Sequence, residues 1–181
     1  MIRSFEGITP TLGEGAWVDD SAQVIGKVTL GADSSVWPLV TIRGDVNAVR
    51  IGARSNIQDN SCLHVTHDGP YSPGGADLTI GDDVTIGHGV ILHACTIGNR
   101  VMIGMGSLVM DEAIVEDEVL LAAGSLVPPG KRLESGWRQL ASIAGVTPFQ
   151  QRRSIAIMGD GGFWHNGLLS GVSSNLFNKG D

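Results

Sequence analysis

The sequence lacks most of the features that mark secreted, membrane-spanning or nucleic-acid-binding proteins. Only two of its 181 residues are cysteine, Cys62 and Cys95. No disulfide framework is therefore expected, and both are predicted to be small buried thiols rather than reactive or metal-binding groups. No leader with a basic and then an apolar segment opens the chain, and no apolar run approaches membrane-spanning length, so the cytoplasm is the expected location. The net charge is −7 with no basic cluster beyond Arg152-Arg153, which argues against nucleic acid and membranes as partners.

An aliphatic residue recurs at every sixth position over much of the chain, from Val18 and Val24 to Val127. A period of six matches neither an amphipathic helix nor a simple strand, but it is typical of hexapeptide β-solenoids. Three short strands would form each coil of a triangular prism, with inward residues eighteen apart building the core. Glycine often follows the inward residue, which predicts corners where a β-carbon would clash or where φ is positive. We expect an all-β solenoid of about five to six coils.

Two interruptions of the period mark the places where function is expected. The step from Ile42 to Ile51 is nine residues long and contains Arg43-Gly44-Asp45. The step from Leu63 to Ile80 is seventeen, so about eleven residues, including 67–75, should leave the prism as a loop. Excursions from a rigid scaffold commonly carry function.

The histidines give the sharpest chemical signal. His64 and His93 each follow an inward leucine, and they are one coil plus the loop apart, so their side chains should lie on adjacent coils of one face. His88 lies on the next strand around a corner, and a neighbouring subunit could supply it. Three imidazoles with a fourth position left to water suit catalytic zinc, while cobalt or ferrous iron would accept the same ligands. The alternative is surface histidines of an acyl-transfer or sugar-nucleotide solenoid, since histidine is a common general base.

Several motifs, in order, resemble the γ-class carbonic anhydrases, particularly the small bacterial members without the long acidic loop. They are IRGDV at 42–46, NIQDNSCLHVTH at 56–67, GHGVILH at 87–93, IGNRVMIGMG at 97–106 and GSLVPPGK at 124–131. The resemblance covers residues 1–136 and implies a left-handed parallel β-helix that forms a homotrimer.

The resemblance also assigns roles to single residues. His64 and His93 of one subunit would bind the metal together with His88 of the next. Gln58 would orient the metal-bound water, and Arg43 and Asp45 would form a charged pair at the interface. Asn56 and Asp59 would support the site, although Asp59 capping its own turn is an equal alternative.

The implied reaction is the reversible hydration of carbon dioxide to bicarbonate by a metal-bound hydroxide, formed because zinc lowers the pKa of its water from 15.7 to about 7. The sequence lacks the glutamate-bearing loop of the most active members and has Val46 where they carry a carboxylate. His67 and Asp68 could carry protons instead, although turn formation explains Asp68-Gly69 equally well, and Tyr71 could line the pocket mouth. Two alternatives stay open: a hexapeptide acyltransferase that uses His67 as the base on acyl-coenzyme A, and a catalytically weak, metal-stabilised trimeric scaffold.

Residues 137–181 do not follow this pattern. The stretches MGDGGFWHNG at 158–167 and NLFNKGD at 175–181 resemble a fragment of the thiamine-diphosphate domain of indolepyruvate ferredoxin oxidoreductases. The asparagine partners of that motif are absent, so no thiamine cofactor is expected. We expect an atypical tail from a fused or misassembled reading frame, with short helices at about 137–145 and in the 160s and 170s, or disorder.

Overall fold

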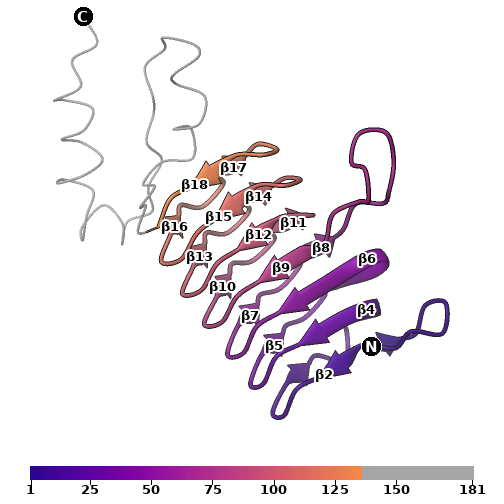
Figure 1. Ribbon diagram of the computed structural model, residues 1–181. Coiled ribbons are helices and arrows are strands. Elements are labelled where there is room, and N and C mark those ends of the chain that lie inside the picture. The colour runs from indigo at the N-terminus through magenta and orange to yellow at the C-terminus, as the bar shows by residue number, and fades with distance from the viewer. Residues whose placement is uncertain (136–181) are drawn as a thin grey trace, which may run out of the picture.

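Each short strand of the repeating coils carries one inward aliphatic residue of the six-residue period, and the two longest strands carry two each. The computed structural model describes residues 1–135, in which parallel strands stack into a triangular solenoid of about seven turns (Figure 1). These residues contain no helix, hence none that is long and apolar enough to cross a membrane. The predicted all-β solenoid is confirmed, and its architecture fits a left-handed β-helix.

The first face of the prism, the six-stranded face, is a separate sheet. Its strands are β3 (Trp17–Val18), β5 (Ser35–Val36), β7 (Asn56–Ile57), β10 (Thr85–Ile86), β13 (Met102–Ile103) and β16 (Leu120–Leu121).

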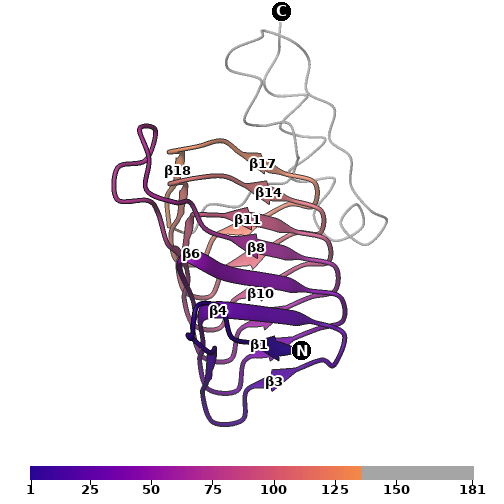
Figure 2. The same ribbon diagram turned by 90° about the vertical axis from the view of Figure 1, so that its right-hand side faces the viewer.

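The other two faces belong to one 12-stranded sheet, because β4 and β6 run around the corner between them. We call the first of these the histidine face (Figure 2). It contains β1 (Ile2–Arg3), the first parts of β4 (Gln23–Leu30) and β6 (Thr41–Ile51), β8 (Cys62–His64), β11 (Ile91–His93), β14 (Leu108–Val109) and β17 (Leu126–Val127). The third face contains β2 (Thr11–Leu12), the last parts of β4 and β6, β9 (Leu78–Ile80), β12 (Thr96–Ile97), β15 (Ile114–Val115) and β18 (Arg132–Leu133).

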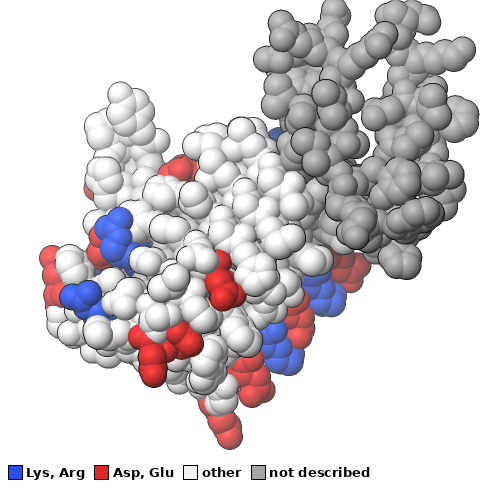
Figure 3. Space-filling model, turned by 180° about the vertical axis from the view of Figure 1, so that it is seen from behind, with Lys and Arg blue, Asp and Glu red and all other residues white. Residues whose placement is uncertain are grey.

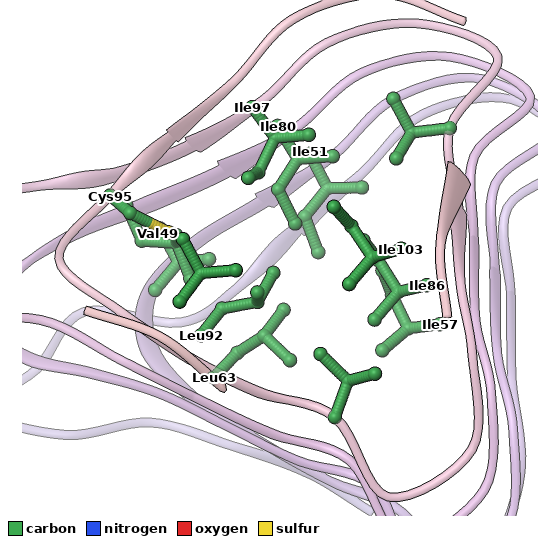
Figure 4. Close-up of a cluster of buried hydrophobic side chains, with 14 of the residues drawn as sticks. Val49, Ile51, Ile57, Leu63, Ile80, Ile86, Leu92, Cys95, Ile97 and Ile103 are labelled. Carbon is green, nitrogen blue, oxygen red and sulfur yellow. The ribbon is translucent and has the colours of Figure 1, made fainter. Parts of the chain in front are cut away.

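The core includes a column of inward side chains from each face, and Val49 and Cys95 add to it (Figure 4). Strand register places Ile57, Ile86 and Ile103 in one column, and Leu63 and Leu92 in the second. These side chains are fully buried. Burying one such side chain stabilises the fold by about 1.5–3 kcal/mol, so the columns account for the coil-on-coil stacking.

The sequence period underestimates the N-terminal end of the solenoid. Strands β1 and β2 precede the first periodic residue, Val18, and pair with β4. The residues between them, which include the Phe5↔Ile8 bridge, break the period. An additional partial coil therefore lies before the six coils that the six-stranded face defines.

Glycines after the inward residues mostly serve close approach rather than positive φ. A β-carbon on Gly52 would lie 2.4 Å from the carbonyl carbon of Gly81 on the next coil, and one on Gly87 would lie 2.8 Å from the Met105 nitrogen. Of the corner glycines at positions 26, 52, 81, 87, 98 and 104, only Gly26 has a positive φ, of 76°. The coils therefore stack more closely at these corners than a side chain would allow.

The corner that joins the third face to the six-stranded face carries a row of charged side chains, which we call the charged ladder. Successive coils place Asp33, Arg54, Asp83, Arg100 and Glu118 there, all with positive φ. Arg54 forms two hydrogen bonds to Asp83, at 2.7 and 2.9 Å, and Arg100 forms two to Glu118, at 3.1 and 3.0 Å. Figure 3 shows acidic and basic side chains following one another along an edge of the solenoid.

The predicted excursion between Leu63 and Ile80 is confirmed. Residues 65–77 leave the solenoid between β8 and β9 and project from it (Figures 1 and 2). Antiparallel bridges Thr66↔Ala76 and Gly69↔Ser72 close this loop on itself. The tail predicted for residues 137–181, with its helices, lies outside the described residues.

Candidate metal centre

His64 and His93 are direct neighbours on the histidine face. They end strands β8 and β11, and the strand register pairs them one to one. His64 Nδ1 lies 3.1 Å from His93 Nε2, and the ring centroids are 5.1 Å apart. The prediction that the two side chains share a face on adjacent coils is confirmed.

A charged pair supports His64 from the previous coil. Asp45 lies where β6 turns from the histidine face to the third face, and its Oδ1 is 3.0 Å from His64 Nε2. Its other carboxylate oxygen accepts a hydrogen bond from Arg43. Burial alone would raise the pKa of Asp45, but its hydrogen bonds to His64 and to backbone amides lower it. Burial lowers the pKa of His64 although the hydrogen bond with Asp45 opposes it, and Arg43 acts in the same direction as burial. This shift favours the neutral imidazole that binds a metal.

His93 has a carboxylate partner that the sequence analysis missed. Asp111 Oδ2 lies 3.0 Å from His93 Nδ1, and the Thr66 hydroxyl donates a hydrogen bond to the other oxygen of Asp111. Although burial opposes it, the hydrogen bond from Thr66 and the proximity of His93 lower the pKa of Asp111. The spacing of 18 residues between His93 and Asp111, one coil, was a usable signal for this contact.

His88 lies apart from this cluster, at the corner between β10 and β11. Its Nδ1 is 3.0 Å from Asp59 Oδ2, and its side chain is 55% exposed. Asp59 occupies the corresponding corner one coil earlier. The supporting role of Asp59 stays a prediction, and this contact with His88 is consistent with it. The turn at residues 88–89, in which Gly89 has a φ of 65°, and strand β11 separate His88 from His93.

The described residues form two half-sites rather than one complete site. Within residues 1–135, no group of three or more His, Cys, Asp or Glu residues converges on a point where a metal could bind. The first half-site consists of His64, His93 and their two carboxylates, and the second consists of His88 and Asp59.

The chemistry of the first half-site fits a metal ion. Two nitrogens that bind one tetrahedral zinc ion at about 2.0–2.1 Å lie about 3.3 Å apart, close to the 3.1 Å between the facing nitrogens of His64 and His93. Each of the three histidines has one ring nitrogen 3.0 Å from a carboxylate oxygen. Such carboxylates typically orient metal-binding histidines.

The remaining candidate residues are placed as follows. Gln58 is half-buried and directly follows β7, next to Asp59 of the second half-site. Asn56 donates a hydrogen bond to Thr85 Oγ1 at 3.1 Å on the next coil, away from the histidine pair. Tyr71 is fully exposed on the projecting loop, and its place at the mouth of a site stays a prediction. His67 and Asp68 are also exposed on this loop, and Asp68 accepts a hydrogen bond from the Gly74 amide.

The prediction of two buried thiols is wrong for Cys62. Because Leu63 points into the core, the preceding Cys62 points outward from the histidine face and is exposed. Cys95 is buried, as predicted, and burial raises the pKa of its thiol to about 12.

Comparison with known proteins agrees with this architecture. Protein YrdA of Escherichia coli is 58% identical over 156 residues, which are 86% of this chain and 82% of YrdA. Gamma carbonic anhydrase 1 of Arabidopsis thaliana, a mitochondrial protein, is 44% identical over 70% of this chain, but the match spans only 46% of the plant protein. The chain belongs to the hexapeptide-repeat family that includes YrdA and the γ-carbonic anhydrases. No protein-family model matches the chain.

A solved structure extends the comparison within this hexapeptide-repeat family. The hexapeptide transferase family protein of Anaplasma phagocytophilum has 41% sequence identity and a TM-score of 0.69, and the match covers 76% of each chain. The match to YrdA includes residues beyond 136, because 156 of the 181 residues take part. Similarity to the family thus continues past the boundary that the motifs indicate.

Proposed function

We propose that the protein is a γ-carbonic-anhydrase-like metalloprotein that catalyses the reversible hydration of carbon dioxide to bicarbonate. His64 and His93 of one subunit and His88 of a neighbouring subunit would bind one metal ion in a homotrimer. Zinc is the expected metal, and cobalt or ferrous iron would fit the same nitrogen ligands. A cytoplasmic location remains a prediction from the sequence.

One observation carries this proposal: every histidine of the set has its own carboxylate 3.0 Å from one ring nitrogen. A surface histidine needs no such partner, whereas a metal ligand needs a fixed tautomer and ring orientation. The two half-sites lie at different corners of the prism, so one chain alone leaves the ligand set incomplete. A cyclic trimer would join the first half-site of each subunit to the second half-site of the next.

The metal, when bound, supplies the Lewis acidity that activates water near neutral pH. The chain's own residues would do the rest. Asp45 and Asp111 hold the imidazoles of His64 and His93, and Asp59 holds His88. Gln58 lies next to Asp59 of the second half-site. It would therefore come to the metal from the same subunit as His88, and it would orient the water that attacks carbon dioxide.

Proton release would limit the rate. Each turnover must deliver a proton to solvent, and Val46, exposed beside the Asp45 corner, cannot carry it. His67 and Asp68 on the exposed loop are the candidates for this transfer. We therefore expect measurable but slow hydration of carbon dioxide, and a scaffold role would account for a metal-bound trimer without activity.

An acyltransferase is the second candidate, because a structural neighbour is named a hexapeptide transferase family protein. This function would use His67 as the base for acyl-coenzyme A chemistry and would not need three converging histidines. It predicts binding of acetyl-coenzyme A and activity that survives the loss of His88.

The first experiment combines metal content, oligomeric mass and stopped-flow carbon dioxide hydration for the wild type and His88→Ala. About one metal per subunit in a wild-type trimer, lost in a His88→Ala trimer together with hydration, supports the proposal. A metal-free wild-type trimer that binds acetyl-coenzyme A would favour the acyltransferase instead.

A subunit-mixing experiment tests whether the site lies between subunits. His64→Ala and His88→Ala proteins would each lack complete sites, but a mixed cyclic trimer has one interface in which both half-sites are intact. Random assembly from equal amounts would restore about one quarter of the sites. Recovery of metal and hydration in the mixture supports a shared site, and no recovery in verified mixed trimers contradicts it.

A further inference from the structure

We propose that Asp111, held by Thr66, is the positioning residue of His93: it fixes the Nδ1–H tautomer and directs Nε2 toward the metal. This inference deepens the proposed function and rests on it only in treating His93 as a metal ligand. Nothing in the sequence motifs assigns a role to either Asp111 or Thr66.

Three successive coils contribute one group each to this arrangement. Thr66 follows β8, His93 ends β11, and Asp111 follows β14. The Thr66 hydroxyl donates to Asp111 Oδ1, and Asp111 Oδ2 lies 3.0 Å from His93 Nδ1. Because Asp111 is a carboxylate, it accepts from both neighbours, so His93 must carry its proton on Nδ1. The lone pair of Nε2 then faces His64.

The surroundings of the two carboxylates differ. Arg43 pairs with Asp45, whereas within residues 1–135 no lysine or arginine pairs with Asp111. An arginine that shares the carboxylate withdraws negative charge from the His64 contact, and the Thr66 hydroxyl carries no charge. A carboxylate partner raises the basicity of a histidine that binds a metal. We therefore expect Asp111 to make His93 a stronger metal ligand than Asp45 makes His64.

Thr66 also links the ligand to the projecting loop. It is the first residue of the Thr66↔Ala76 bridge that closes the loop, and the Asn47 side chain donates to its carbonyl oxygen at 2.7 Å. The hydroxyl is therefore anchored on the solenoid side of the loop. Asp111 is fixed from one side by this hydroxyl and from the other by the ring it orients.

The first test is nuclear magnetic resonance of the metal-free protein, which reports histidine tautomers without any metal or activity. The His93 signals, assigned with His93→Gln, should show the Nδ1–H tautomer in the wild type and a mixture of tautomers in Asp111→Ala. A wild-type His93 protonated on Nε2 alone would overturn the proposal.

The second test measures zinc and cobalt dissociation constants by chelator competition on the trimer. Asp111→Ala should weaken zinc binding about 10- to 100-fold, and Asp111→Asn should weaken it less, because the amide oxygen still accepts from His93. Thr66→Val should give a smaller loss and Thr66→Ser none. Glu112→Gln, next to Asp111 and exposed, is the matched control and should bind zinc as the wild type does.

The outcomes separate this inference from the proposed function. Wild-type zinc affinity in trimeric Asp111→Ala overturns the positioning role. If that variant does not assemble, wild-type affinity in both Asp111→Asn and Thr66→Val overturns it. If the wild type hydrates no carbon dioxide but the Asp111 and Thr66→Val variants bind zinc more weakly than it does, the positioning role is supported and the proposed activity is rejected.

Discussion

His64 Nδ1 and His93 Nε2 face each other across 3.1 Å between neighbouring strands. Ligands already held at this separation need little ordering when an ion binds. We expect cobalt to give a visible spectrum typical of a low-coordinate site, and His64→Ala or His93→Ala to abolish it. His67→Ala, which removes a histidine on the exposed loop, is the control. Loss of the spectrum in this control alone would place the metal on the loop instead.

Much of this arrangement follows from the sequence because a solenoid converts sequence spacing directly into spatial contact. The period of six placed Leu63 and Leu92 in one core column, and that phase brought His64 and His93 together. Cys62 was predicted to be buried because cysteine is usually a buried residue, although its position directly before the inward Leu63 places it on the outer side of the strand. Asp111 was missed because it lies one coil away in a segment without a recognised motif, although the 18-residue spacing identifies it.

Other features cannot be read from the period of a single chain. Leu12 of β2 lies on the period, eighteen residues before its partner Leu30, but the residues between β1 and β2 break it, so β1 became visible only through its pairing with β4. The partner of the His64 and His93 half-site belongs to a second copy of the chain in our proposal, and intrachain spacing carries no information on how copies dock.

The exposed thiol provides a probe of the histidine face. Cys62 lies on this face beside the register partner Ile91, whereas Cys95 is buried with a pKa of about 12. If this face meets a neighbour in the trimer, a thiol reagent should modify Cys62 slowly at high protein concentration and faster after dilution below the trimer dissociation range. Cys95 should react only on unfolding, because almost no thiolate is present. Labelling of Cys62 that does not depend on concentration would place this face outside the interface.

Two isoleucines of one coil should separate folding from assembly. Ile86 is fully buried in the core, and Ile91 is 46% exposed on the histidine face. Ile86→Ala should lower the free energy of unfolding by about 2–5 kcal/mol. If the histidine face lies in the proposed trimer interface, Ile91→Ala should leave the unfolding of the monomer nearly unchanged but shift the trimer toward monomer at equal concentration. Denaturant unfolding and analytical ultracentrifugation measure the two effects, and the opposite assignment would contradict the core and face described here.

Acid should weaken the corners where carboxylates accept hydrogen bonds from the adjacent coil. The Asn99 backbone amide, and then its side chain, donate to Asp117 and lower its pKa. A carboxyl whose folded pKa is depressed contributes stability above its unfolded pKa, near 3.9, and loses it as pH falls through the lower folded value. Urea midpoints below about pH 4 should therefore fall less steeply for Asp117→Asn than for the wild type. Equal slopes for the two proteins would show that this contact is not coupled to folding.

The charged ladder should behave as a row rather than as independent pairs. Asp83 is the main group that raises the pKa of Arg54, and Asp82 and then Asp33 act in the same direction. Arg100 adds to the lowering of the Asp83 pKa by Arg54. Arg54→Asp alone should lower the Tm, since three acidic groups would then follow one another. Exchanging the two charges in Arg54→Asp/Asp83→Arg restores the pair, but it places an acidic side chain next to Asp33 and Asp82 and a basic one next to Arg100.

The exchange distinguishes the two descriptions of this corner. An isolated pair predicts full recovery of the Tm, whereas the ladder predicts partial recovery. The deficit should shrink in about 1 M salt, where the screening length is about 3 Å. Because arginine and aspartate both already occupy this left-handed position on other coils, backbone preference does not account for a deficit that salt removes.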